Sequence, residues 1–383
     1  MPARQASERS TDVGQLRAIF SGGGTGGHLF PALAIADELK QLEPGAEILF
    51  IGTRDKIEAT VVPKKGYQFR PIWIGGFRRG FHATNLLFPV RTLVGLMQAV
   101  RIIRKFRPDV VVGTGGYVSG PVLRSAVSLH VPTLIQEQNS YPGITTRLLA
   151  RKVDEVHLTF ERSAQYIGRK EGVFITGNPT RAGLDGADPE EAARYFGFDP
   201  AFGGRTVLIF GGSLGAQSIN AAIEKSLDLL MNRGIRIVWQ TGEADAGKEK
   251  KLCEAWGPAR VWVGAFIDAM EYAYRVCDLV VCRAGATTIA ELTRLGKPAI
   301  LVPYPHAAAN HQVENARSMA EAGAAEIVYD YEALESLGTR ILGALKGPGL
   351  TDMSMKSLKL GKPDAARKIA GRVLALARRS GRG

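Results

Sequence analysis

Short apolar runs recur along the chain, and each is followed by a polar or glycine-rich turn and then by a longer stretch with helical spacing. Eight runs show this pattern, at residues 16–20, 47–52, 109–113, 132–137, 206–212, 235–240, 278–283 and 298–303. Because the runs are short, rich in β-branched residues and apolar at nearly every position, they predict strands buried on both faces. The alternation of such strands with helices predicts an α/β fold built on parallel sheets.

Two of these strand, turn and helix units resemble each other half a chain apart. The run that ends at Phe20 leads into SGGGTGG, and the run that ends at Phe210, 190 residues later, leads into GGSLGAQ. Such a repeat predicts two doubly wound, Rossmann-like domains that face a cleft.

The turn-rich segment GNPTRAGLDGADPEE at residues 177–191 marks the predicted division between the two domains. We therefore expect an N-terminal domain at 1–180 and a C-terminal domain at 181–355. Residues 356–383 contain an amphipathic helix that starts near Asp364. The sequence leaves open which domain this helix packs on, and packing back on the N-terminal domain is one of the two options.

Composition points to an anionic partner. The chain carries 49 Lys and Arg against 37 Asp and Glu, a net charge of +12, which suits a phosphate ligand, an anionic lipid or a nucleic acid. Glycine accounts for 45 of 383 residues, well above the average share of about 7%. Because the glycines cluster in short loops without a period, they favour close approach of the backbone to a ligand.

The cysteines and the N-terminal segment bear on the compartment. Cys253, Cys277 and Cys282 are odd in number and lack CxxC spacing, so they predict neither a disulfide framework nor a zinc site. The first residues lack the apolar stretch of a signal peptide, and no run reaches the roughly 18 apolar residues of a spanning helix. We therefore expect a cytosolic protein that is neither exported nor integral.

The first glycine loop resembles a dinucleotide motif. Gly22, Gly24 and Gly27 match GxGxxG between a strand and a helix. An NAD site also needs an acid at the end of the next strand, whereas that strand ends in Gly52-Thr53-Arg54, which suits NADP better. An NADP-dependent oxidoreductase is therefore an alternative. A Walker loop is excluded, because His28 stands where Lys would follow the last glycine.

Four further glycine-containing turns follow strand-like runs, starting at Gly113, Gly177, Gly211 and Arg283. Bare backbone N–H groups beside a helix N-terminus can bind phosphate or a sugar hydroxyl with no side chain in the way. Any one turn is better explained as a tight connection, but five at strand ends favour a bound diphosphate. No strand-end Asp-x-Asp pair accompanies them, so we expect no metal and no other cofactor.

Seven motifs occur in a characteristic order: GGGTGGHLFPALAIADEL, GTGGYVSGP, QEQN, GNPTR, GGSLGAQ, FIDAM and CRAGATTIAEL. In their order and spacing they resemble the MurG family of peripheral glycosyltransferases, which act in peptidoglycan synthesis. The resemblance implies a glycosyltransferase fold of the B type. It also implies transfer of GlcNAc from UDP-GlcNAc to the 4-hydroxyl of undecaprenyl-diphosphate-MurNAc-pentapeptide, which converts lipid I to lipid II. A B-type glycosyltransferase with another lipid-linked or small acceptor is the nearer alternative.

The resemblance implies that the N-terminal domain binds the acceptor lipid and the C-terminal domain most of UDP-GlcNAc. The implied donor-binding residues are Thr25, Gly26, Gly27, Asn139, Arg181, Ser213, Ile267, Ala286, Thr287, Thr288, Ile289, Ala290, Glu291 and Gln312. Arg181 and Ser213 fall on the diphosphate, and Asn139 falls on the GlcNAc. Ile267 would meet the uracil through its main chain, and Gln312 the sugar hydroxyls.

Simpler explanations stay open for several of these residues. Thr288 and Glu291 fit a capping box, S/T-x-x-E, which competes with ribose binding as the role of Glu291. Arg181 could be a solvated surface charge, although a guanidinium in an interdomain turn is well placed to bind a phosphate bidentately. Asn139 could simply start a turn, and Gln312 could cap the following helix.

Transfer in this family inverts the anomeric centre, which implies one direct displacement and a base for the acceptor hydroxyl. His28 is the first candidate, because an imidazole titrates near neutrality and this one follows the first glycine loop at a helix start. Its alternative role is to hold the loop in shape by hydrogen bonding. Glu137 is the second candidate, and its alternative role is to orient the acceptor.

Residues 64–107 contain ten Lys or Arg, no Asp or Glu, and many large apolar side chains. A segment of this kind favours a surface that rests on an anionic leaflet, and the expected membrane-contact residues are Phe77, Phe81, Leu86, Leu87 and Phe88. We therefore expect a peripheral protein on the cytoplasmic face of the cell membrane. Nucleic acid is the rival partner, but no nucleic-acid-binding motif accompanies the basic segment, so we expect none to bind.

Overall fold

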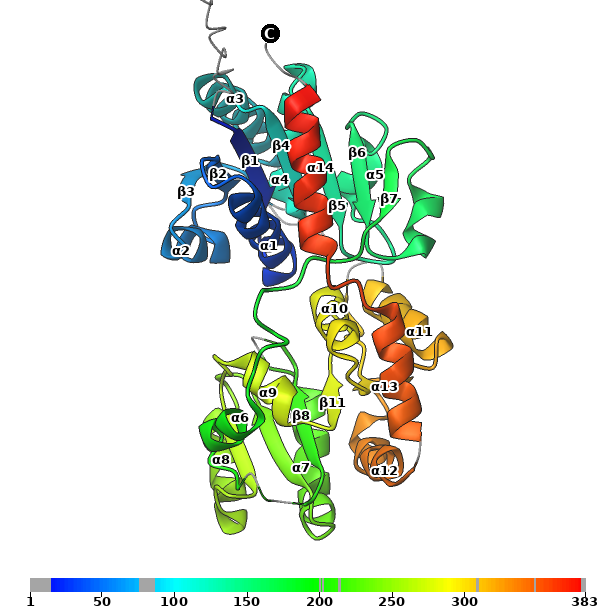
Figure 1. Ribbon diagram of the computed structural model, residues 1–383. Coiled ribbons are helices and arrows are strands. Elements are labelled where there is room, and N and C mark those ends of the chain that lie inside the picture. Colours follow the sequence, from blue (N-terminus) through cyan, green and yellow to red (C-terminus); the bar gives the residue numbers. More distant parts are fainter. Residues whose placement is uncertain are drawn as a thin grey trace, which may run out of the picture.

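The computed structural model describes residues 15–75, 87–199, 201, 203–212, 215–307, 310–347 and 349–379. Within these residues the chain forms two parallel sheets, one after the other in sequence, with helices packed on both faces (Figure 1). The predicted α/β class with two Rossmann-like units is therefore confirmed. We call the parts built on the first and second sheets the N-terminal unit and the C-terminal unit.

The N-terminal unit has the strand order β3-β2-β1-β4-β5-β6-β7. Its strands are β1 (Arg17–Gly22), β2 (Glu47–Gly52), β3 (Gln68–Pro71), β4 (Val110–Gly115), β5 (Thr133–Glu137), β6 (Glu155–Leu158) and β7 (Val173–Ile175). Its helices are α1 (Gly26–Leu42), α2 (Ile57–Lys64), α3 (Phe88–Phe106), α4 (Gly116–Ser128), α5 (Ile144–Leu149) and η2 (Glu161–Tyr166). Since β1 pairs with both β2 and β4, the chain reverses its winding direction here, and open parallel sheets bind ligands at such a point.

The C-terminal unit repeats this arrangement with the order β10-β9-β8-β11-β12-β13. Its strands are β8 (Thr206–Phe210), β9 (Arg236–Gln240), β10 (Val261–Gly264), β11 (Leu279–Cys282), β12 (Ala299–Leu301) and β13 (Ala325–Ile327). Its helices are α6 (Pro189–Tyr195), α7 (Gln217–Met231), α8 (Ala246–Cys253), η3 (Glu254–Trp256), α9 (Met270–Val276), α10 (Ala286–Leu295), α11 (His311–Glu321), α12 (Ala333–Lys346) and α13 (Gly349–Leu360).

The central strands are buried along nearly their whole length because helices cover both sheet faces. Phe20 on β1 pairs in register with Phe50 on β2 and Val112 on β4, and all three side chains are buried. Each sheet has one apolar cluster on each face. The apolar side chains buried there supply the main driving force for folding, at roughly 25 cal/mol per Å². Rigid strands therefore carry the glycine turns at their carboxyl ends.

The chain crosses from the C-terminal unit back to the N-terminal unit near its end. Helix α13 packs on α10 and so belongs to the C-terminal unit. The predicted boundary at position 356 therefore lies inside α13, which spans Gly349–Leu360. The chain then crosses at residues 361–364, and α14 (Ala365–Arg379) lies beside α1, as Figure 1 shows. Ile369 and Val373 are fully buried in the same cluster as Ala18 and Phe20 of β1. The last helix thus belongs to the core of the N-terminal unit.

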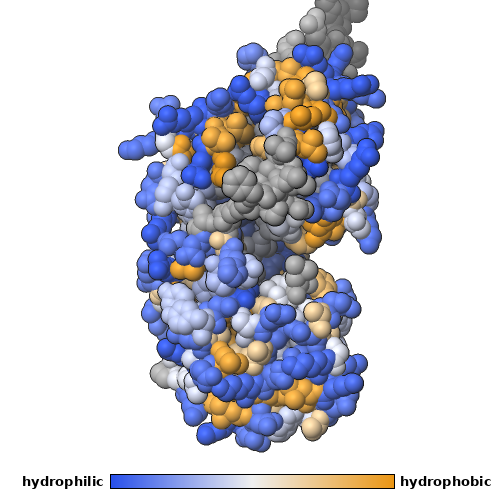
Figure 2. Space-filling model, turned by 180° about the vertical axis from the view of Figure 1, so that it is seen from behind, coloured by the Kyte–Doolittle hydropathy of each residue, from blue (hydrophilic) through white to orange (hydrophobic). Residues whose placement is uncertain are grey.

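Helix α3 presents an apolar stripe to solvent. Leu87, Val90, Leu93 and Met97 recur every three or four residues, and each is about half exposed. Seen from behind in Figure 2, apolar patches lie on the upper part of the molecule, amid a hydrophilic surface. Within the described segments, no helix is long and apolar enough to cross a membrane.

Of the residues expected to contact a membrane, two lie in the described part of the chain. Leu87 is exposed and Phe88 is half-buried at the start of α3. Phe77, Phe81 and Leu86 lie outside the described residues.

Candidate functional site

The first two glycine loops of the N-terminal unit touch each other at the ends of β1 and β4. Gly116 has a φ of +77°, and a Cβ there would lie 2.4 Å from the carbonyl oxygen of Gly23, so only glycine fits. The buried carboxylate of Glu58 supports the first loop, because it accepts hydrogen bonds from the N–H groups of Gly24 and Thr53, each at 3.0 Å. The hydrogen bonds to Glu58 and the close contact with the second loop therefore fix the shape of the first loop.

His28 lies half-buried in the first turn of α1. Its Nδ1 is 3.1 Å from Oγ1 of Thr25, and the Thr114 hydroxyl donates to its carbonyl oxygen at 2.7 Å. Burial lowers the pKa of His28 below its ordinary value of 6.5; the Glu137 carboxylate opposes this shift, and His311 of the C-terminal unit adds to it. The imidazole is therefore mainly neutral at pH 7, the state that can accept a proton.

Glu137, at the end of β5, is buried and accepts four hydrogen bonds. Oε1 accepts from the N–H of Asn139 at 3.1 Å and from its Nδ2 at 3.3 Å. Oε2 accepts from the N–H of Gly143 at 3.0 Å and from the Thr146 hydroxyl at 2.6 Å. Because its acceptor sites are already used, Glu137 holds Asn139 and the start of α5 in place. Of the two candidate bases, His28 is thus better suited to take a proton.

The C-terminal unit has a pocket of about 750 Å³ where β8 and β11 end. It is lined by Phe210, Gly211, Gly212, Gly215, Ala216, Gln217, Ser218, Arg283, Gly285, Thr288, Tyr304, Pro305, His306, Gln312 and Asp330. Gly215 has a φ of +78°, and a Cβ there would lie 2.0 Å from the carbonyl oxygen of Thr241. The glycine turn that starts at Gly211 is thus folded tightly against the residue that follows β9, and the pocket stays open above it.

Arg283 forms one wall of this pocket and is held from three sides. Its Nη1 donates to the carbonyl oxygen of Val302 at 3.2 Å and to Oδ1 of Asp330 at 2.5 Å. Its Nη2 donates to the Ser218 hydroxyl at 2.9 Å, and the ring of Tyr304 lies 5.4 Å from the guanidinium. The guanidinium is therefore fixed before any ligand binds.

A buried carboxylate joins the interdomain turn to α10. Nε of Arg181 donates to Oε1 of Glu291 at 2.9 Å, and the Tyr274 hydroxyl donates to Oε2 of Glu291, also at 2.9 Å. Burial and the adjacent Glu291 carboxylate raise the pKa of Tyr274 well above its ordinary value, so the hydroxyl keeps its proton. Glu291 thus holds the guanidinium of Arg181 beside the first turns of α10.

Comparisons with known proteins identify the family. Residues 18–158 match the Glycosyltransferase family 28 N-terminal domain, and residues 206–369 match the Glycosyltransferase family 28 C-terminal domain. The chain is 47% identical to the UDP-N-acetylglucosamine--N-acetylmuramyl-(pentapeptide) pyrophosphoryl-undecaprenol N-acetylglucosamine transferase of Prosthecochloris aestuarii, over 94% of this chain and 99% of that protein. The protein of the same name from Salinibacter ruber is 44% identical over 94% of this chain and 97% of its own length.

A crystal structure of MurG from Acinetobacter baumannii superposes with a TM-score of 0.74 at 29% identity, covering 94% of this chain and 99% of that one. The chain belongs to the MurG family. The resemblance based on the seven motifs is therefore confirmed. A UDP-N-acetylglucosamine 2-epimerase from Listeria monocytogenes shares the fold at 14% identity, with a TM-score of 0.68.

Within this MurG-family site, the predicted donor residues fall in several places. Thr288 and Gln312 line the pocket, and Oε1 of Gln312 accepts from the N–H of Tyr304 at 2.9 Å. Thr25 and Gly27 are exposed on the facing loop, and Gly26 is half-buried. Ser213 lies outside the described residues.

Other members of the predicted set do not line this pocket. The N–H of Ile267 donates to Oε1 of Gln240 at 2.9 Å, so this main-chain group already has a partner. Ala286 is buried, and Ile289 and Ala290 line a separate cavity. Thr287 has a buried hydroxyl with no hydrogen-bond partner among the described residues.

The capping-box interpretation of Thr288 and Glu291 is wrong. Helix α10 starts at Ala286, its N-cap residue is Gly285, and no side chain caps it. The Glu291 carboxylate instead binds Arg181 and Tyr274. The sequence pattern matched a cap, but the helix begins three residues earlier than the pattern requires.

Two side chains of the site were not anticipated from the sequence. In the sequence, Glu58 stands out only weakly, as an acid in the first turn of a short helix. Its role in supporting the loop could not be predicted, because the two are 34 residues apart in the sequence. Arg283 lay inside a recognised motif, but only the fold brings it to Asp330. In the described segments, no group of three or more His, Cys, Asp or Glu could hold a metal ion.

Proposed function

We propose that this protein transfers GlcNAc from UDP-GlcNAc to the 4-hydroxyl of undecaprenyl-diphosphate-MurNAc-pentapeptide, producing lipid II for peptidoglycan synthesis. The observation that carries the proposal is the open pocket at the ends of β8 and β11, with the glycine turns at its base, in a chain of the MurG family. UDP-GlcNAc occupies this pocket, and the acceptor approaches from the loops of the N-terminal unit, where Thr25 and His28 lie.

The diphosphate is bound by α10 and Arg181 without a metal ion. Helix α10 has no side-chain cap, so the N–H groups of its first turn and the positive end of its dipole are available for an anion. The unpartnered hydroxyl of Thr287 lies in the same turn. As UDP leaves, these groups and the guanidinium of Arg181 stabilise the growing negative charge on the β-phosphate.

The displacement is a single step with inversion, and His28 removes the proton of the attacking hydroxyl. The neutral imidazole accepts that proton while the C1–O bond to UDP breaks. Thr25, beside Nδ1, holds the ring at the edge of the loop. Asn139, fixed by Glu137, is positioned to contact the GlcNAc.

We expect UDP-GlcNAc to raise the melting temperature of the protein, because a ligand that binds only the folded state stabilises it by mass action. NADPH and a short DNA duplex, at the same protein and salt concentrations, should leave the melting temperature unchanged. Formation of a GlcNAc-extended lipid from labelled donor and lipid-linked acceptor then tests transfer. A rise with NADPH and none with UDP-GlcNAc would refute the proposal and favour a dinucleotide site.

We also propose that the α3 face rests on the cytoplasmic face of the cell membrane, so that the protein is peripheral there. The exposed stripe of Leu87, Val90, Leu93 and Met97 supplies the apolar contact. A shallow pocket beside it is lined by the basic side chains Arg101, Arg104 and Lys105, which attract anionic lipid headgroups. This surface accounts for part of the net positive charge without invoking nucleic acid.

Leu93→Ser combined with Met97→Ser should weaken binding to anionic vesicles at least tenfold, because the cost of removing two half-buried apolar contacts exceeds about 1.4 kcal/mol. The affinity for UDP should not change. The matched control replaces Leu334 and Met355, which are also about half exposed and lie on the C-terminal unit, by Ser. Vesicle sedimentation measures both pairs, and equal losses in the two pairs would contradict this membrane face.

A further inference from the structure

One buried side chain of the C-terminal unit binds the loop that carries Asn139. Asn315, on α11, is fully buried. Its Oδ1 accepts from the N–H of Ser140 at 3.2 Å and from the Ser140 hydroxyl at 2.8 Å. Its Nδ2 donates to the carbonyl oxygen of Ala284 at 3.2 Å. A single amide therefore joins the loop after β5 to the turn that precedes α10.

The loop is also tied down from its own side. The Ser163 hydroxyl, on η2, is shared between the carbonyl oxygens of Asn139, at 2.9 Å, and Ser140, at 3.2 Å. Both Ser140 and Ser163 are buried. Any displacement of Ser140 relative to Asn315 therefore leaves buried polar groups without partners, which is costly.

A second contact crosses the same boundary but is weaker. Arg162, next to Ser163, pairs with Glu314, next to Asn315, at 3.0 Å. The Arg162 side chain is 48% exposed, and an exposed ion pair of this kind contributes little in water. The buried contact of Asn315 is therefore the polar contact here that can fix the two loops to each other.

We propose that Asn315 and Ser140 form a clasp that positions the two halves of the active site. The clasp sets the distance between Asn139 on one side and the Gly285 turn that opens the diphosphate site on the other. Asn315 and Ser140 touch no substrate; they act through the loops that do. The inference rests on the proposed function for its kinetic test, and it has a structural test of its own.

The kinetic consequence differs from that of a purely structural contact. UDP is held by the C-terminal unit, so its affinity does not depend on the clasp. The sugar must be held between the two units, so transfer does depend on it. Loss of the clasp should therefore lower kcat/KM for UDP-GlcNAc and leave the dissociation constant of UDP unchanged.

The experiment compares Ser140→Ala, Asn315→Ala and the double variant. Ser140→Ala should lower kcat/KM for UDP-GlcNAc about tenfold, the effect of one lost hydrogen bond in a positioned site. In the Asn315→Ala background the same change should have no further effect, since its partner is already gone. Ser357→Ala is the control, because this buried hydroxyl bonds within the C-terminal unit, to the carbonyl oxygen of Leu292. It should leave kcat/KM unchanged.

The clasp is refuted if Ser140→Ala keeps the wild-type kcat/KM. It is also refuted if the loss of kcat/KM in the double variant equals the product of the losses in the two single variants. A wild-type protein that binds UDP-GlcNAc and transfers nothing would refute the proposed function instead. The clasp is then tested by electron–electron distance measurements between spin labels at Leu148→Cys and Tyr331→Cys, which are exposed on opposite units. Ser140→Ala should broaden the distance distribution, and Ser357→Ala should not. An unchanged distribution in Ser140→Ala overturns the clasp by itself.

Discussion

Replacing His28 by Asn should lower kcat by about 10²–10⁴-fold, the usual contribution of a general base. Asn keeps a polar group that can bond to Thr25, but it cannot accept a proton from the attacking hydroxyl. The affinity for UDP-GlcNAc, measured by calorimetry, should stay within a few fold of wild type. Steady-state rates at saturating donor and acceptor give the comparison.

The pH dependence distinguishes the base from a loop-holding residue. Because burial lowers the pKa of His28, the neutral form persists below pH 6.5, and kcat should fall only when the pH drops further. This acidic limb should disappear in His28→Asn. The control is Thr25→Ala, which removes the side chain beside Nδ1 and should cost only a few fold with the limb intact. If His28→Asn keeps kcat within a few fold of wild type, the assignment is wrong.

Glu137→Gln tests the second candidate for the general base. Both carboxylate oxygens of Glu137 accept hydrogen bonds, but the amide of Gln replaces one of them by an NH2 group, which donates. That group would face N–H or hydroxyl donors, so the loop that carries Asn139 should shift. KM for UDP-GlcNAc should therefore rise, while the acidic limb of kcat should stay. Loss of that limb in Glu137→Gln would favour Glu137 as the base instead.

The inner strands of both sheets were predictable, and several outer ones were not. Runs such as 206–212 are apolar at nearly every position because helices cover both sheet faces, and this leaves a clear signal. The edge strand β3, Gln68–Pro71, alternates exposed and half-buried residues over only four positions. The still shorter β13, Ala325–Ile327, has one buried residue. Too few apolar positions recur in such strands to distinguish them from loops.

In the site, backbone features were easier to predict than side-chain partners. Glycine turns at strand ends follow from local sequence, since the turn itself demands glycine. The partner of Glu291 depends on Arg181, which is 110 residues away, and the tie of Asn315 to Ser140 spans 175 residues. No local pattern encodes such pairs. The resemblance to the MurG family indicated which residues belong to the site, but it did not show which side chains they contact.

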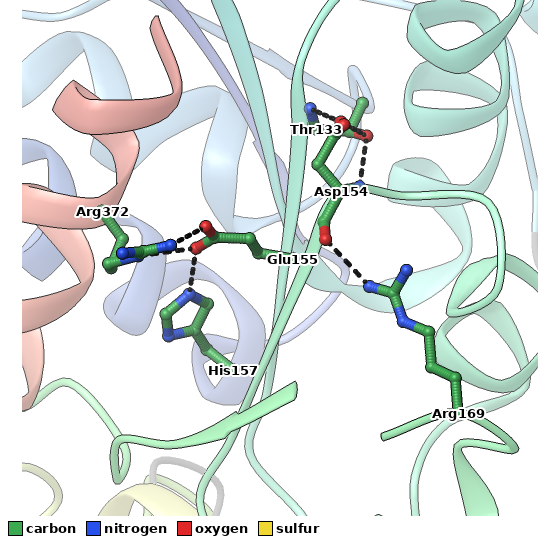
Figure 3. A network of polar contacts seen from close by, with 6 residues as sticks. All are labelled: Thr133, Asp154, Glu155, His157, Arg169 and Arg372. Carbon is green, nitrogen blue, oxygen red and sulfur yellow. Dashed lines mark hydrogen bonds and ion pairs between the residues drawn. The ribbon is translucent and has the colours of Figure 1, made fainter. Parts of the chain in front are cut away.

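The last helix offers the largest expected effect on stability, because an ion pair with a buried carboxylate fastens it to the first sheet (Figure 3). Nε of Arg372, on α14, donates to Oε2 of Glu155 on β6 at 3.0 Å, and its Nη2 donates to Oε1. His157 lies 3.1 Å from the same carboxylate, and its ring stacks on Phe174. Burial opposes ionisation of Glu155, but hydrogen bonds from His157 and Arg372 prevail and lower its pKa to about 2.

Arg372→Met should destabilise the protein by about 1–3 kcal/mol at pH 7, because it leaves the buried Glu155 carboxylate without its partly exposed cation. The wild-type carboxyl has a folded pKa below its unfolded value, so its contribution is full above about pH 4.5 and is lost as the pH falls toward 2. The difference between Arg372→Met and wild type should therefore shrink across that range. Urea unfolding followed by circular dichroism at pH 7 and pH 3 measures it.

Two companion variants separate loss of the charge pair from loss of packing. Arg378→Met, on the same helix, breaks only a surface pair with Glu43 at 3.3 Å and should cost less than about 1 kcal/mol. Adding Glu155→Gln to Arg372→Met removes the unpaired charge while keeping an acceptor for His157, and most of the stability should return. If Arg372→Met unfolds at the same urea concentration as Arg378→Met, the ion pair does not hold α14. Since α14 packs on α1, whose first turn carries His28, loosening α14 should also lower the transfer rate of Arg372→Met, and the double variant should regain both properties together.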